Sequence, residues 1–186
     1  MRFRRLLSLP AILFALTLLM VGTSRASAQA ADSAHVNHLL MTAEHYSNLA
    51  ANDAEMLETY ARTRVSWETH AHQLERIREN VNNLGKIVQQ LNEARSEGSP
   101  WQQNAIDRIN PLMHEMAMQL TTTIDHLSTN QHRVKMKPYH DYARATYEVT
   151  RRAALIISDY VEYGRANAKA EALEKKIELP SSGQEE

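Results

Sequence analysis

From Ser33 to Leu84 the chain contains neither glycine nor proline. Apolar residues in this stretch recur every three or four positions, as they do on one face of a helix. Good helix formers are abundant throughout residues 31–178, whereas the apolar–polar alternation of strands is hard to find. The sequence therefore predicts an all-α protein.

The periodicity predicts two helices before residue 98. The first begins at a cap on Asp32 or Ser33, and a break near residues 62–66 separates it from the second. Arg62 and Arg64 suit a helix C-terminus, and Ser66 followed by Glu68 suits an N-terminus. The alternative is one continuous helix. The expected core stripe is Val36, Leu39, Leu40, Ala43, Tyr46, Ala50, Leu57 and Tyr60, then Trp67, Ala71, Leu74, Ile77, Val81, Leu84, Val88 and Leu91.

A third helix begins with the clearest local signal in the chain. Ser99 is a cap, Pro100 occupies the first helical position, where its missing N–H costs nothing, and Gln102 completes a capping box. Pro111 lies inside the helix, so we expect a kink or a restart with Asn110 as a local cap. The expected stripe is Ile106, Ile109, Met113, Met116, Leu120, Ile124, Leu127 and Val134.

A fourth helix begins near Pro138. Four helices of similar length, about 45–55 Å each, with short connections predict an antiparallel up-down-up-down four-helix bundle over residues 31–178. Residues 179–186 are expected to form a disordered tail. The fourth stripe is Tyr142, Thr146, Val149, Ala153, Ile156 and Tyr160.

Residues 1–30 have the layout of a cleaved secretory signal peptide. A start rich in arginine precedes an apolar stretch from Leu6 to Val21, and small residues around Ala28 and Ala30 follow. The apolar stretch is shorter than the ~20 residues of a spanning helix. We expect cleavage after Ala30, with Ala28 as the second choice, and a mature protein without a transmembrane segment in the periplasm or outside the cell.

Composition excludes several function classes. Cleavage at residue 30 removes four arginines and no acidic residue, which leaves 17 basic and 22 acidic residues and a formal charge of −5. No basic patch stands out to bind nucleic acid. Cysteine is absent, which excludes disulfides, thiol chemistry and covalent c-type haem. No motif for nucleophilic catalysis or phosphate binding occurs, so we expect no enzymatic activity and no cofactor.

The nine histidines are the first candidates for a site. Only His70 lies on a core stripe, where it is interpreted as a core histidine. The alternative is a metal- or haem-binding bundle in which His70 meets Met113 or Met116, two methionines that also suit copper(I) or simply fill core space. The other histidines are expected to lie at the edge of a stripe (His35) or away from it (His38, His45, His72, His114, His126, His132 and His140).

Gly85 and Gly164 interrupt the second and fourth helices. Each would cost about 1 kcal/mol relative to alanine at an exposed position. Close contact between helices explains them best, and space for a shared ligand is the alternative. Together these features predict an exported, soluble, non-enzymatic bundle that acts as a binding or scaffold module in the cell envelope. We expect its partner to be another protein or a second copy of itself.

Overall fold

The computed structural model describes residues 31–178, which form helices and connecting turns with no strand among them. The prediction of an all-α protein is therefore confirmed for this part of the chain. The predicted signal peptide (1–30) and tail (179–186) lie outside the described residues. The long helices are α1 (Ala34–Ala61), α2 (Trp67–Glu93), α3 (Pro100–Thr129) and α4 (Lys137–Glu178), and the two 3-10 turns are η1 (Arg95–Glu97) and η2 (Gln131–Arg133).

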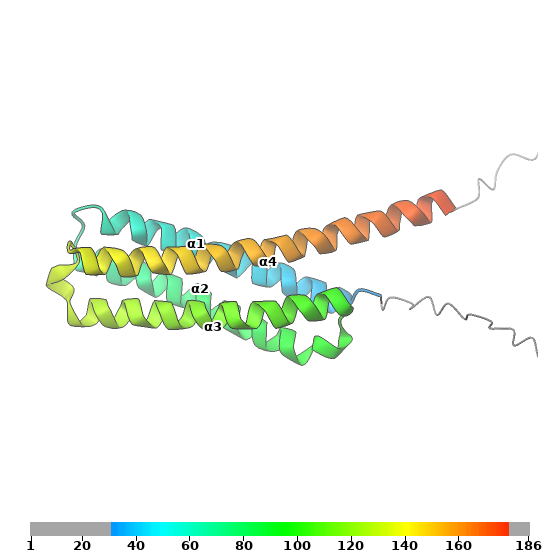
Figure 1. Cartoon of the computed structure of the whole chain (residues 1–186), viewed down its shortest axis with the longest axis horizontal. Coiled ribbons are helices and arrows are strands. Elements are labelled where there is room, and N and C mark those ends of the chain that lie inside the picture. Colours follow the sequence, from blue (N-terminus) through cyan, green and yellow to red (C-terminus); the bar gives the residue numbers. More distant parts are fainter. Residues whose placement is uncertain (1–30, 179–186) are drawn as a thin grey trace, which may run out of the picture.

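The four long helices lie alongside one another as in a four-helix bundle (Figure 1). Helix α1 contacts α2 and α4, and helix α3 contacts the same two helices. The α1–α2 and α3–α4 connections lie at one end of the bundle, and the α2–α3 connection lies at the other (Figure 1). We call these the histidine end and the tryptophan end, after His70 and Trp101.

Polar side chains fix where the helices begin. The Ser33 hydroxyl accepts a hydrogen bond from the backbone N–H of Val36 at 3.3 Å, which caps α1 as predicted. Ser99 and Gln102 form the predicted capping box of α3. Helix α1 ends at Ala61 and α2 begins at Trp67. The break predicted near residues 62–66 is therefore present, and the continuous helix is not.

Gln102 does more than cap its own helix. Its Oε1 atom accepts hydrogen bonds from the backbone N–H groups of Ser99 and Ser33, each at 2.9 Å. Its amide nitrogen donates to the Ser33 carbonyl and to Asn37 Oδ1, also at 2.9 Å. Asp32 accepts from Trp101 Nε1 at 2.6 Å. These buried and half-buried contacts join the beginnings of α1 and α3 at the tryptophan end.

The predicted restart at Pro111 is wrong, because α3 runs from Pro100 to Thr129 without interruption. Proline has no backbone N–H to donate to the carbonyl one turn earlier in the helix. Because Pro111 is exposed, water can hydrate that carbonyl. Asn110 does not cap a new helix. Its amide nitrogen donates to the Ile106 carbonyl at 3.1 Å and to Asn92 on α2 at 2.7 Å.

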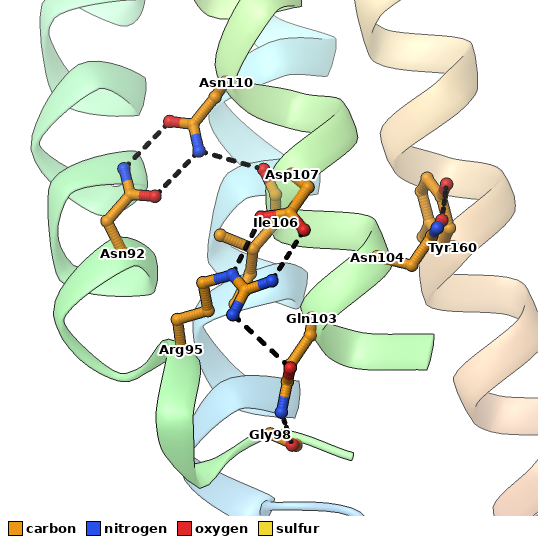
Figure 2. A network of polar contacts seen from close by, with 9 residues as sticks. All are labelled: Asn92, Arg95, Gly98, Gln103, Asn104, Ile106, Asp107, Asn110 and Tyr160. Atoms are coloured by element: carbon orange, nitrogen blue, oxygen red, sulfur yellow. Dashed lines mark hydrogen bonds and ion pairs between the residues drawn. The ribbon is translucent and has the colours of Figure 1, made fainter. Parts of the chain in front are cut away.

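Polar contacts set the register between α2 and α3 near the tryptophan end (Figure 2). Asn92 and Asn110 exchange two amide hydrogen bonds of 2.8 and 2.7 Å. Arg95 donates to both carboxylate oxygens of Asp107 at 2.8 and 2.7 Å, and these hydrogen bonds lower the pKa of Asp107. The Asn92–Asn110 pair joins α2 to α3, and the Arg95–Asp107 pair joins η1 to α3, so both favour the observed alignment.

Most residues of the predicted stripes of α1, α2 and α3 form the core. The exceptions are half-buried at its edge, namely Tyr46, Tyr60, Trp67, Ala71, Met113 and Ile124. Val134 is buried but lies beyond the end of α3. In α4 only Thr146 and Ala153 of the predicted stripe are buried, and the larger residues of the stripe lie about one position away from the buried face. Ile156 and Tyr160 are only half-buried, whereas Ile157 and Val161 are buried. The displacement arises because small residues line the buried face, namely Ala143, Thr146, Thr150, Ala153 and Ala154.

Helix α4 is also longer than predicted. It has 42 residues, against 28, 27 and 30 in the other three helices, so the prediction of matched lengths is wrong. Its C-terminal part projects beyond the tryptophan end of the bundle (Figure 1). We call residues 166–178 the overhang.

Candidate functional site

The predicted site residue His70 lies in a cluster of histidine and tyrosine side chains at the histidine end. His70 is in the first turn of α2 and is only 1% exposed. Tyr139, in the first turn of α4, is equally buried, and the two rings meet edge to face with their centroids 4.9 Å apart. The Tyr60 ring from α1 approaches His70 at 6.4 Å. Three helices therefore enclose the imidazole.

Three polar atoms of this cluster are buried and have no hydrogen-bond partner among the described residues. They are His70 Nδ1, the Tyr139 hydroxyl and His140 Nε2. Such an atom costs about 1–3 kcal/mol when it is left unpaired. The cluster is therefore one of the less stable parts of the core.

Burial also determines the charge of these groups. Desolvation, with a smaller contribution from the neighbouring His140, lowers the pKa of His70 to about 4. Desolvation raises the pKa of the Tyr139 hydroxyl. Both groups are neutral at pH 7. With a pKa of about 4, the His70 imidazole is a weaker base than a histidine in water.

Two histidines that were predicted to point away from the core belong to the edge of this cluster, so that prediction is wrong for them. His126 is half-buried, and its ring centroid lies 4.4 Å from that of Tyr142. His140 is half-buried beside His70. The displaced phase of α4 explains the error for His140. His38, His45, His72, His114 and His132 are exposed as predicted, and His35, predicted at the edge of a stripe, is exposed too.

The two methionines proposed as partners of His70 lie elsewhere. A Cβ atom at Gly85 would lie 3.8 Å from the Met113 Cε atom, and Gly85 is about 22 Å from His70 along α2. Met116 is buried one turn further along α3, which shortens the separation by no more than about 5 Å. His70, Met113 and Met116 are therefore not brought together in this structure.

Gly164 marks a close helix contact at the tryptophan end. A Cβ atom there would lie 2.8 Å from Trp101 Cη2, closer than real carbon contacts allow. The ring of Trp101 also meets the ring of Tyr163 with their centroids 5.2 Å apart. Close packing therefore explains Gly164, while Gly85 has only an ordinary contact with a methionine.

An apolar groove lies between α2 and α3 near the histidine end. Its volume is about 240 Å³, and Trp67, Leu74 and Leu127 contribute to its walls. Glu75 and Arg78 also line it. Ser128 and Gln131 complete the polar part of its wall.

The overhang carries the most exposed large apolar side chain of the described residues. Ile177 is 81% exposed and Leu173 is 50% exposed. Every residue from 168 to 177 is exposed. The side chains of Leu173 and Ile177 are therefore largely uncovered by the rest of residues 31–178, whereas Ala170 lines a surface pocket together with Asp32 and Trp101.

Within these same residues, no group of three or more His, Asp or Glu side chains is placed to hold a metal ion. None of the helices from α1 to α4 contains a stretch long and apolar enough to cross a membrane. Comparison of the chain with protein-family models, with curated proteins and with solved structures returned no match.

Proposed function

We propose that this chain is exported and acts without catalysis as a binding or scaffold module in the cell envelope, with the overhang of α4 as its binding element. The observation that carries this proposal is the exposure of Leu173 and Ile177 on a helix that projects from the bundle (Figure 1). Leu173 and Ile177 are four residues apart and therefore lie on one face of the helix. Amphipathic helices contact their partners through apolar residues at this spacing.

Three further features support the proposal. The N-terminal signal layout, with the mature chain beginning at Ala31, directs the protein to the periplasm or beyond. The helix connections lie at alternate ends of the bundle, as is typical of up-down-up-down bundles. We include this antiparallel order in the proposal. The rigid bundle then holds the overhang at a fixed position, as a scaffold requires.

Site-specific photo-cross-linking in the producing cell tests the proposed binding element. A photoreactive amino acid replaces Ile177 in one strain and Met118 in another. Met118 is a matched control because it is also apolar and exposed (57%) but lies on α3. We expect discrete cross-linked products from position 177 and none from position 118. Absence of products at 177, with the protein folded and exported, would contradict the proposal.

A further inference from the structure

Five apolar residues around the overhang follow a heptad pattern, while Ala168 and Ala172 lie outside it at positions f and c. Tyr163, Ala166, Ala170, Leu173 and Ile177 are spaced by three, four, three and four residues. This alternation places Tyr163, Ala170 and Ile177 at position a and the other two at position d. A repeat of 3.5 residues keeps one stripe in contact with a partner helix, whereas packing in a globular core follows 3.6. We call these five residues the seam.

The end of the seam that carries Leu173 and Ile177 faces away from the bundle, whereas Tyr163 at its other end packs against Trp101. At 100° per residue, Leu173 lies about 180° around α4 from Gly164, which packs against Trp101. Ile177 lies about 160° around the helix from Val161, which is buried in the core. The chain's own α1 and α3 therefore leave Leu173 and Ile177 uncovered, and a second molecule can cover them.

The side chains at the C-terminal end of the seam favour a parallel pair of helices. Leucine at d and a β-branched residue at a are the combination preferred by parallel two-stranded coiled coils. Leu173 and Ile177 provide this combination. Asp159 occupies the d position before Ala166 and is exposed. Two Asp159 carboxylates would face each other in a parallel pair and repel, so the seam begins at Tyr163.

The flanking charges identify the partner. Lys169 occupies position g and Glu174 the following e position, and neither forms an ion pair within residues 31–178. In a parallel pair of identical helices, each Lys169 faces Glu174 of the other copy, which gives two opposite-charge contacts. In an antiparallel pair, position g faces position g, so Lys169 would face Lys176.

We infer that the overhang pairs in parallel with the overhang of a second copy of this chain, so that the protein forms a symmetric dimer through the seam. This inference rests on the proposed function, because it names the partner of the same binding element. Two heptads bury little surface compared with a standard interface. The dimer is therefore weak and dissociates on dilution.

Charge reversal tests both the partner and the orientation. Lys169→Glu or Glu174→Lys alone places like charges opposite each other twice in the dimer, and the double variant restores both pairs. The matched controls are Lys175→Glu and Glu171→Lys, which make the same charge changes at positions f and b, outside the seam. Sedimentation velocity over a range of concentrations gives the dimer dissociation constant, and circular dichroism verifies that each variant is folded.

We expect each single reversal to raise the dissociation constant roughly tenfold, the double variant to return to within about threefold of the original, and the controls to change little. A stronger dimer in Lys169→Glu would indicate antiparallel pairing and overturn the inference. A chain that stays monomeric at all concentrations would overturn it too. If that monomer still gave cross-links at position 177 to a protein of different mass, the proposed function would stand and only the second copy as partner would be wrong.

Discussion

The indole ring of Trp101 occupies the space that a side chain on Gly164 would need. A Cβ atom at that position would lie 2.8 Å from Cη2 and 3.2 Å from Cζ2 of the ring. The indole N–H of Trp101 is at the same time held by Asp32 at 2.6 Å. The ring therefore cannot turn aside without losing a hydrogen bond, and α4 approaches α3 closely only because residue 164 is glycine.

Gly164→Ala should consequently lower the free energy of unfolding by about 1–3 kcal/mol, the usual cost of overpacking a core. Gly85→Ala is the matched control, since its new methyl group would meet only the flexible end of Met113 at 3.8 Å. That substitution should raise stability by about 0.5–1 kcal/mol through helix propensity. Urea unfolding of both variants measures the difference, and equal effects would refute the close contact.

His70 should make the bundle sensitive to acid. Its pKa is about 4 in the folded protein and about 6.5 in the unfolded chain, so between these pH values the unfolded state binds more protons. The contribution of His70 to the free energy of unfolding is therefore fully present above pH 6.5. It decreases by about 3 kcal/mol as the pH falls towards 4. Urea unfolding at pH 7.5, 5.5 and 4.5 measures the decrease.

The variant His70→Gln should lose this part of the pH dependence, whatever its stability at pH 7.5. His72→Gln provides the control, because His72 is exposed two residues away on the same helix. An unchanged pH dependence in His70→Gln would show that other groups cause the acid sensitivity.

Leu120→Ala should cost about 2–5 kcal/mol, because the Leu120 side chain is buried in the middle of α3 and its removal leaves a cavity. Met118→Ala, on the exposed face of the same helix, should change stability by no more than about 0.5 kcal/mol. Thermal or urea unfolding compares the two. Similar small effects would mean that the phase of α3 is incorrect.

Export can be tested by N-terminal sequencing of the protein from the producing cell. Because the apolar stretch from Leu6 to Val21 is too short to remain as a membrane anchor, the mature protein should begin at Ala31 or at Gln29. Protein that retains Met1 in a membrane fraction would contradict the proposal of export.

Local signals allowed part of this fold to be predicted from the sequence. The cap at Ser99 and its partner Gln102 are three residues apart, so their contact depends on few other parts of the chain. The bonds from Gln102 to Ser33 and Asn37 join residues more than sixty positions apart, and only the assembled bundle brings them together.

The phase of α4 was missed for a different physical reason. Its buried face consists largely of alanine and threonine, such as Ala153 and Thr150, while larger apolar and aromatic side chains lie at its edges. A search for large apolar residues therefore selects the wrong direction. The same displacement concealed His140 beside His70, so the histidine cluster could not be predicted. The length of α4 was missed because its overhang contains no glycine or proline to mark the end of the bundle.

The central claim is that the overhang is the binding element, and the mass in solution of the protein recovered from the envelope fraction tests it most directly. The substitutions Leu173→Asp and Ile177→Asp together remove the exposed apolar pair, while Met118→Asp serves as the control on α3. We predict that, at a concentration well above the dimer dissociation constant, the original protein and the control elute in a complex larger than the monomer, and that the double variant elutes as a folded monomer with unchanged circular dichroism. A double variant that keeps the same larger mass, or an original protein that is monomeric at that concentration, would contradict the account.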